Sequence, residues 1–130
     1  MRGARSTYAA EIRKELNEAD CGDLPRNGSF VVGAIARDGS PLGDVIAHLG
    51  ISKQAAGQLV DTLVVRGYLE RRPDPDDRRR LTVALTPRGE LAATAGRDAV
   101  ERVDARLAEK VGVDDYVRTR RTLGALIDLA

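Results

Sequence analysis

The chain has 130 residues, enough for one domain with a modest core and too few for two independent ones. Hydrophobic residues make up 42% of it and charged residues 32%, which favours a globular, helix-rich protein over a disordered one. The net charge is +1, no apolar run approaches the roughly 18 residues of a membrane span, and a single cysteine excludes an internal disulfide.

The first half of the chain shows helical patterns. Its first residues lack the pattern of a signal peptide, so we expect a cytoplasmic protein without a membrane partner. Residues 6–19 predict a first helix, which the breakers in "CGDLPRNG" end. A short apolar helix is expected from Phe30 to Arg37. Ser40 and Pro41 then form a start signal, an N-cap followed by proline in the first helical position, for a helix over 42–49.

A second helix follows after a short turn that contains glycine. The helix over 42–49 ends at Gly50, and Ser52 is the expected N-cap of a longer helix that runs to about Arg66 and ends at Gly67. Two helices joined by a turn of about three residues are typical of a helix-turn-helix.

The longer helix has an apolar face and a polar face. Its expected core positions are Ala56, Leu59, Val60 and Leu63. The opposite face, toward solvent or a groove, carries Gln54, Gly57, Gln58 and Asp61. A glycine in mid-helix costs about 1 kcal/mol relative to alanine. Either a close partner benefits from the missing side chain, or the glycine is a neutral result of drift.

After Gly67 the period of the apolar residues changes to two. Tyr68–Arg72 and Leu81–Leu85 are predicted to pair as a β-hairpin, with the charged stretch "DPDDRRR" of residues 74–80 at its tip. A helix-turn-helix followed directly by such a hairpin is a winged helix, which we predict as a DNA-binding region over 26–86.

The winged helix also holds the excess of positive charge. Residues 50–90 have a net charge of +2, against −1 for residues 1–49 and 0 for residues 91–130. All but three of the 21 basic residues are arginine, which suits bidentate contacts with phosphates or base edges. The codon bias of a GC-rich genome explains the arginine excess equally well.

Two helices are expected to complete the chain. Thr86 and Pro87 predict the start of a long helix that runs to about Lys110, and Gly112 separates it from a final helix. The long helix has a narrow apolar stripe made of Ala92, Ala95, Ala99, Val103 and Leu107. The final helix carries Tyr116, Val117, Leu123, Leu126 and Ile127. Such stripes suit packing against a second subunit, although packing against their own domain would produce the same pattern.

The order of these motifs resembles the MarR family of bacterial transcription regulators. The resemblance is carried by "LGDVIAHLGIS", which starts at Leu42, and by "QLVDTLVVRGYLERRPDPDDRRRLTVALTPRG", which ends at Gly89. Its most specific part is Asp77-x-Arg79, a strand, and then "LTPRG". The resemblance implies a homodimer with interlocking N- and C-terminal helices. It also implies a recognition helix in the major groove of DNA and a wing tip in the adjacent minor groove.

The resemblance can be carried over to individual residues. It implies DNA contacts by Ser52, Lys53, Gln54, Ala55, Gly57 and Gln58 on the recognition helix, and by Arg71 and Arg79 in the hairpin, with Asp77 as the wing aspartate. Arg78 and Arg80 flank Arg79, within expected reach of phosphates. The chain departs from the common family pattern at positions 55, 57 and 58. There it has Ala, Gly and Gln where relatives commonly have Ser or Thr at the first two and Arg at the third.

The chemistry of these side chains agrees with contact to DNA. A narrow, A·T-rich minor groove has enhanced negative potential and attracts an inserted arginine such as Arg79. Gln54 and Gln58 lie one turn apart, and glutamine can bond adenine bidentately with about 1–3 kcal/mol of discrimination per pair. Ser52 and Lys53, at the start of the helix, are better placed for phosphates, which set the register without reading sequence.

The acids of the stretch 74–80 have an expected role as well. Asp77 can pair with Arg79 or with Arg71, which would fix the direction of a guanidinium before binding. Asp74 and Pro75 are typical of a turn. A solvated charged loop is the alternative interpretation of the whole stretch.

Other candidate sites are weak. Cys21 stands between acidic neighbours, a setting that does not favour a reactive thiolate, and His48 is expected to be a surface or capping residue. With one histidine and one cysteine, a His/Cys zinc site within the chain is excluded, and we predict no metal and no cofactor. Tyr8, Tyr116 and Phe30 either line a small-molecule pocket between the dimer helices and the DNA-binding region or belong to the core.

We therefore predict a mainly α fold with a small β-hairpin wing, an α+β winged helix-turn-helix in one domain over 1–130. Dimerisation helices are expected over 5–20 and 87–130. The expected function is that of a homodimeric, sequence-specific DNA-binding repressor on a pseudo-palindromic operator, with relief by a small-molecule effector left open. The alternative is a winged-helix protein-interaction module whose wing arginines bind acidic protein surface. An enzyme ranks last because the sequence shows no catalytic constellation.

Overall fold

The computed structural model describes residues 2–38, 42–79 and 81–127. This part of the chain folds into six helices and one antiparallel hairpin, as predicted. The elements in order are α1 (Arg2–Glu18), α2 (Gly28–Asp38), α3 (Leu42–Leu49), α4 (Lys53–Val65), β1 (Leu69–Pro73), β2 (Leu81–Leu85), α5 (Pro87–Val111) and α6 (Val113–Ile127). No helix in the described ranges is long and apolar enough to cross a membrane.

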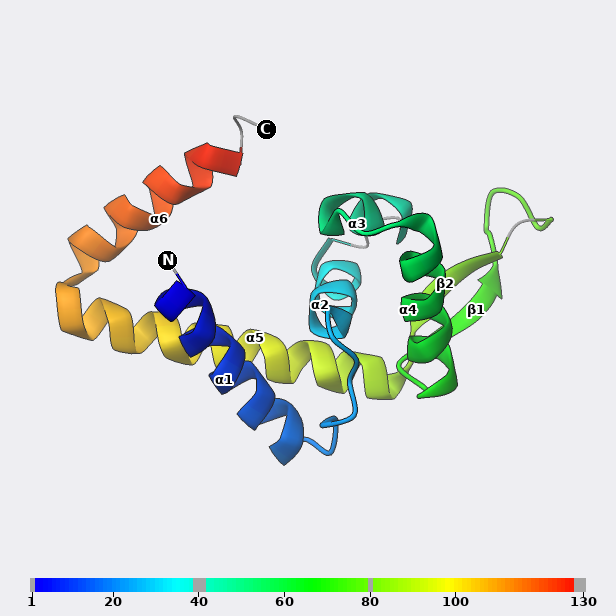
Figure 1. The fold of residues 1–130 in the computed structure, drawn as a ribbon, viewed down its shortest axis with the longest axis horizontal. Helices are drawn as coiled ribbons and strands as arrows, with labels where there is room; N and C mark the ends of the chain where they lie inside the picture. The colour runs from blue at the N-terminus through cyan, green and yellow to red at the C-terminus, as the bar shows by residue number, and fades with distance from the viewer. Residues whose placement is uncertain (1, 39–41, 80, 128–130) are drawn as a thin grey trace.

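The elements form a lobe, made of α2, α3, α4 and the hairpin, and an arm, made of the second half of α5 together with α6. Figure 1 shows α2, α3, α4 and the hairpin gathered around the N-terminal end of α5, while α1 crosses its middle and α6 turns back from its far end. In the hairpin, Leu69 pairs with Leu85 and Pro73 with Leu81. The lobe is thus a winged helix-turn-helix, in which α4 occupies the place of the predicted recognition helix.

Local signals in the sequence set most of the helix ends. The Ser52 hydroxyl accepts the N–H of Ala55 at 3.1 Å, so Ser52 is the N-cap of α4. Thr86 caps α5 in the same way through the N–H of Gly89, at 3.0 Å. Gly67 ends α4 with a φ of 75°, in the left-handed region that favours glycine.

Some boundaries differ from the prediction. α1 begins at Arg2 rather than residue 6, and the first strand begins at Leu69 rather than Tyr68. The predicted Ser40–Pro41 start signal lies outside the described residues. Such shifts of a few residues leave the order and type of the elements unchanged.

The core lies where the lobe packs on the first half of α5. α4 buries Ala56, Leu59 and Leu63, as predicted, with Val60 half-buried. α5 contributes a face of small residues, Ala92, Ala95 and Ala99, against which α1 and α2 both pack. Small side chains let the neighbouring backbones approach closely, so this part of the narrow stripe packs within the chain's own core.

The arm leaves apolar side chains exposed. Leu107, the last residue of the α5 stripe, is 39% exposed, and on α6 the exposed fraction is 54% for Val117, 48% for Leu123 and 54% for Leu126. The stripe is therefore buried over its first part and open over its last part.

Candidate nucleic-acid interface

The outward face of α4 presents polar side chains to solvent. Lys53, Gln54 and Gln58 are exposed, and Ala55 is half-buried beside them. Gly57 lies between the two glutamines, and an added Cβ there would meet nothing within 4 Å. The face is thus flat at its centre and has hydrogen-bonding groups on both sides, which suits close approach to a ligand surface.

The acids of the hairpin tip shape its backbone. Asp74 Oδ1 accepts the N–H of Asp76 at 2.8 Å and that of Asp77 at 3.3 Å, and Asp77 Oδ1 accepts the N–H of Arg79 at 3.0 Å. These are Asx turns, in which a short carboxylate replaces a backbone acceptor. Asp77 thus contacts the backbone of Arg79, while Arg71, the alternative partner expected for it, pairs with Asp61.

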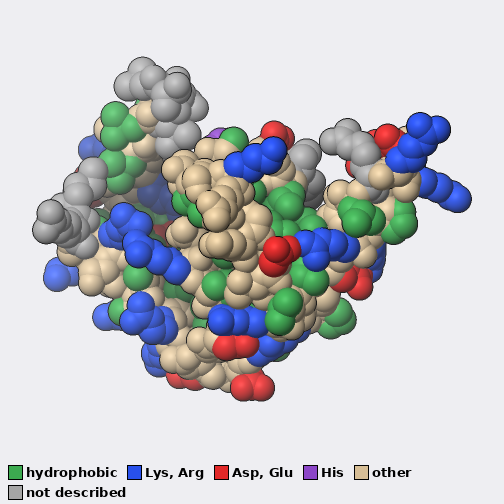
Figure 2. Space-filling view, turned by 45° about the vertical axis from the view of Figure 1, so that its right-hand side comes forward, with side chains coloured by type: hydrophobic (Ala, Val, Ile, Leu, Met, Phe, Trp, Pro, Cys, Tyr) green, Lys and Arg blue, Asp and Glu red, His purple; other side chains and the backbone are tan. Residues whose placement is uncertain are grey.

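The arginines of the hairpin fall into two groups. At its base, Arg71 pairs with Asp61 of α4, and Arg72 pairs with Glu70. At its tip, Arg78 and Arg79 are exposed, and neither guanidinium has a partner among the residues that the structure describes. Figure 2 shows basic side chains extending from the outer end of the projecting hairpin. Arg80 lies outside the described residues.

This geometry was compared with known proteins. The sequence model of the MarR family matches residues 23–80, from the α1–α2 connector to the hairpin tip. The solved structure of RV1404 from Mycobacterium tuberculosis is 24% identical with a TM-score of 0.69, over 97% of this chain and 86% of that one. The repressor CouR, bound to a 23-mer DNA duplex, is 22% identical with a TM-score of 0.71, over 97% and 88%.

A third solved structure, a DNA complex of S. aureus MepR, is 16% identical with a TM-score of 0.68, over 98% of this chain and 94% of that one. Comparison with curated proteins gave no match. Residues 23–80 therefore match the MarR family, and the chain as a whole shares the fold of these solved structures. It has the family's winged-helix fold, with the flanking helices α1, α5 and α6 in place.

A cluster of contacts joins the lobe to α5, and sequence reasoning missed it. The buried Tyr68 donates its hydroxyl hydrogen to Asp23, and the Arg88 guanidinium lies over the Tyr68 ring at 4.4 Å from its centroid. Burial and this hydrogen bond raise the pKa of Tyr68. The same hydrogen bond, with Arg88 and Arg66 nearby, holds the pKa of the Asp23 carboxyl below its usual range.

The only signal of this cluster in the sequence was the family motif around Gly89. An added Cβ at Gly89 would lie 2.1 Å from the carbonyl oxygen of Tyr68, so the motif marks a close backbone approach. It gave no indication that Arg88 and Asp23, 65 positions apart, would meet.

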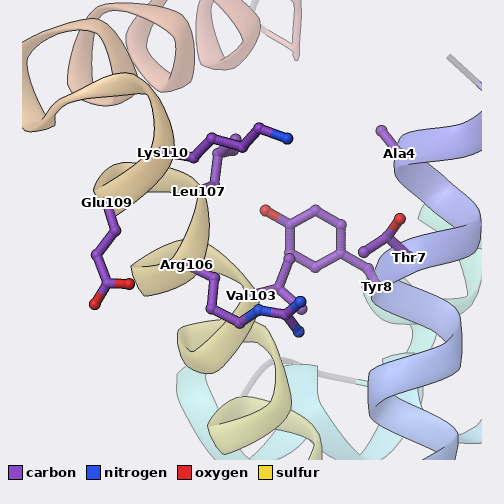
Figure 3. Close-up of a pocket in the computed structure, with 8 residues that line it drawn as sticks. All are labelled: Ala4, Thr7, Tyr8, Val103, Arg106, Leu107, Glu109 and Lys110. Carbon is purple, nitrogen blue, oxygen red and sulfur yellow. The ribbon is translucent and has the colours of Figure 1, made fainter.

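Tyr8, Tyr116 and Phe30, which were expected either to line a shared pocket or to belong to the core, do not line one pocket. Figure 3 shows Tyr8 pointing from α1 toward α5 into an open groove, which Val103 and Leu107 line from the other side. The volume of this groove is about 620 Å³. This groove lies on the arm, away from the lobe. Phe30, on α2, is 46% exposed and does not line it.

Tyr8 and Tyr116 instead belong to a polar cluster across three helices. Asp104 of α5 accepts the Tyr8 hydroxyl at 2.5 Å and Arg120 of α6 at 2.8 Å, and Arg120 also donates to the Tyr116 hydroxyl at 2.8 Å. The hydrogen bond to Asp104 raises the pKa of Tyr8 to about 12. The cluster holds the start of α6 against α5 and α1.

The remaining candidates have structural surroundings. Cys21 is fully buried, and its thiol donates weakly to the carbonyl of Ala19, with a sulfur–oxygen distance of 3.4 Å. His48 is exposed in the last turn of α3, with Nδ1 2.7 Å from the carbonyl oxygen of Asp44. Both placements agree with the structural roles expected from the sequence.

Proposed function

We propose that this chain is a sequence-specific DNA-binding repressor that acts as a homodimer on a pseudo-palindromic operator. One observation carries the proposal. The exposed polar face of α4 is joined to a hairpin whose tip carries Arg78 and Arg79, two arginines whose guanidinium groups have no partner in the described part of the chain. A helix for the major groove and a basic tip for the neighbouring groove is the arrangement that base readout and phosphate contact together require.

The contacts on α4 divide by chemistry. Ser52 and Lys53 stand at the helix N-terminus, where N–H groups and the helix dipole favour a phosphate. Gln54 and Gln58 supply donor and acceptor pairs for base edges in the major groove. Ala55 and Gly57 have small side chains, so that the helix backbone can approach the groove closely.

The contacts of the hairpin also divide. Arg79 is oriented through its backbone by Asp77 and enters the minor groove, while Arg78 and Arg80 contact phosphates on either side. Arg71 at the base is assigned to DNA by the family pattern, and its pairing with Asp61 connects it to the reading helix.

The second copy is supported by the apolar surface of the arm. Leu107, Val117, Leu123 and Leu126 are 39–54% exposed in one chain, beside the groove that Tyr8 lines. A second copy seated there would bury this surface. One winged helix contacts few bases, whereas a dimer on two half-sites one helical turn apart increases both affinity and specificity.

Repression and an effector rest on the relatives. CouR, a repressor, was solved on DNA, and S. aureus MepR was solved with ethidium bromide. We extend both properties to this chain. Repression would follow from occlusion of a promoter, and a small molecule would relieve it by favouring a dimer whose reading helices are wrongly spaced.

The experiment is fluorescence-anisotropy binding to DNA upstream of the chain's own gene and to fragments selected from genomic DNA, against a scrambled duplex. Binding is measured at 50 mM and 200 mM salt. For about six phosphate contacts, affinity should fall about 10³-fold between these concentrations, with clear preference for the selected fragments. Weak binding that ignores both sequence and salt would contradict the proposal and favour the protein-interaction module.

A further inference from the structure

The junction between the lobe and α5 is held by one side chain that contacts three separate segments. Arg88 is the second residue of α5. Its guanidinium donates to the carbonyl of Arg66 at 2.6 Å, to the carbonyl of Asp20 at 3.1 Å and to the Asp23 carboxylate at 3.0 Å. It also covers the ring of Tyr68 at 4.4 Å.

These partners belong to the parts of the lobe that determine where the DNA-reading surface points. Arg66 is the C-cap of α4, so the cation lies at the negative end of the reading helix. Tyr68 directly precedes β1, at the root of the hairpin. Asp20 and Asp23 lie in the connector between α1 and α2, and Asp23 also accepts from Tyr68 and, through its carbonyl, from Arg66.

The backbone around Arg88 is fixed as well. Thr86 donates its hydroxyl hydrogen to the carbonyl of Gly67 and its N–H to that of Tyr68 at 3.2 Å. Gly89 touches the same Tyr68 carbonyl, with no room for a Cβ. The junction is therefore a joint with contacts on both sides of Arg88, and the guanidinium extends it to the connector.

Small changes at this joint are amplified by the length of α5. With 25 residues, α5 is about 37 Å long, so a rotation of about 5° at its N-terminus displaces its far end by about 3 Å. The exposed apolar surface assigned to the dimer lies on that far end and on α6. In a dimer held there, the angle at the joint determines the distance between the two α4 helices.

We propose that Arg88 is a positioning residue that fixes the angle between α4 and α5 and thereby sets the half-site spacing that the dimer reads. The proposal rests on the proposed function for its dimer and its DNA target. Arg88 contacts no DNA in this arrangement. It acts through the orientation of α4 and the hairpin.

The first test measures the spacing without DNA. Gln54→Cys places one spin label per chain at the exposed start of α4, while the native Cys21 is fully buried, and the wild-type chain controls for its labelling. Pulsed electron–electron double resonance then measures the distance between the spin labels on the two α4 helices of a dimer. We expect a narrow distribution of label-to-label distances for the parent, the chain that carries only Gln54→Cys. The addition of Arg88→Gln should shift or clearly broaden this distribution.

Arg97→Gln is the matched control, because Arg97 is an exposed arginine of α5 without a partner among the described residues. It should leave the distribution unchanged. Arg88→Lys keeps the charge but cannot reach all three acceptors, so it should give an intermediate result, and it substitutes if Arg88→Gln does not fold. A distribution as narrow and at the same distance in both Arg88 variants would overturn the proposal.

The second test reads the spacing on DNA. The selected operator is rebuilt with one or two base pairs added or removed at its centre. The wild type should bind about tenfold or more weakly to operators whose half-site spacing differs from the best one, because the two recognition helices cannot then bind both half-sites at once. Arg88→Gln should flatten or shift this dependence, whereas a merely structural role would lower affinity equally at every spacing and overturn the proposal.

The two proposals fail in different ways. A parent without an intersubunit distance or without selective binding would contradict the dimeric repressor itself. A parent with both properties, and Arg88 variants that reproduce its spacing, would contradict only the positioning role.

Discussion

At the first turn of α5, the Cα of Gly89 lies against the backbone of the hairpin root. An added Cβ would lie 2.1 Å from the Tyr68 carbonyl oxygen and 2.9 Å from Leu85 Cδ2. The nearer atom belongs to the backbone, so relief requires a shift of α5 relative to β1. We expect Gly89→Ala to lower the free energy of unfolding by about 1–3 kcal/mol, as other overpacked sites do.

Gly96 provides the matched control in the same helix, because an added Cβ there meets nothing within 4 Å. Gly96→Ala should raise the free energy of unfolding by up to about 1 kcal/mol through helix propensity. Urea denaturation of both variants measures the two values. A Gly89→Ala variant as stable as the wild type would show that the joint is not closely packed.

The charge on Asp23 should make stability depend on pH. The pKa of this carboxyl is held below its ordinary range, chiefly by the hydrogen bond from Tyr68. Since the folded pKa lies below the unfolded one, the contribution is complete above about pH 4, the ordinary aspartate value, and is lost as pH falls through the native pKa. Asp23→Asn should therefore be less stable than wild type at pH 7, and the difference should shrink in acid.

Denaturation between pH 7 and pH 2 measures this difference, with Asp98→Asn as the control. Asp98 is an exposed residue of α5 with no partner in the described part of the chain. A difference between Asp23→Asn and wild type that is the same at every pH would exclude a role for the ionised carboxylate.

At the scale of elements, α4 combines a core face with a reading face, and Gly57 lies in the middle of the latter. Gly57→Ala should stabilise the helix by about 1 kcal/mol, because the position is open. If the face approaches the floor of a groove, the added methyl should also weaken binding to the selected operator. Thermal unfolding and anisotropy on the same preparation test both directions, and a gain in stability with unchanged affinity would contradict close approach.

The hairpin offers a separate test, because its tip and its base differ in their partners. Arg79 is unpartnered among the described residues, whereas Arg71 already pairs with Asp61. Arg79→Ala should weaken operator binding strongly and reduce the slope of log affinity against log salt by about 1 for a phosphate contact, or by less for a pure groove contact. Arg97→Ala controls for the loss of one charge, and unchanged affinity of Arg79→Ala would contradict the wing assignment.

Much of this architecture could be predicted from the sequence, because caps and periodicities are local. Ser52 and Thr86 begin their helices and Gly67 ends α4 where expected, and the apolar spacing of α4 identified the face that is buried. The joint could not be predicted in this way. The contact between Asp23 and Arg88 depends on how α1, α4 and α5 are brought together, and nothing in either local pattern encodes it.

The same limit applies to two details that depend on tertiary structure. The carboxylate of Asp77 accepts the backbone N–H of Arg79 after a tight turn, a contact that the charge pattern alone did not indicate. Tyr8, Tyr116 and Phe30 were grouped by their aromatic character. Which aromatics share a cavity depends on how the helices pack: the groove lies between α1 and α5, whereas Phe30 lies on α2.

At the scale of the whole molecule, the buried core lies between the lobe and the first half of α5, and the arm lies outside it. The lobe and the first half of α5 form the buried core, although Phe30, Val65, Leu81 and Leu91 are exposed there, while the end of α5 and α6 expose most of their large apolar residues. Contiguous exposed apolar surface of this kind marks an interaction surface. The Asp104–Arg120 pair holds α6 in place against α5, so this surface is presented in a defined geometry.

The dimer prediction follows from that surface. Light scattering at micromolar concentration should give the mass of two chains for the wild type. Leu123→Asp combined with Leu126→Asp should weaken association by about 100-fold or more, because each carboxylate would be buried without a partner. Both leucines are about half exposed in the single chain, so its helical content should be retained. Thr94→Asp adds one such carboxylate at an exposed position of α5 and should remain dimeric. The double variant should lose operator affinity together with the dimer, whereas a dimeric double variant would place the subunit contact elsewhere on the chain.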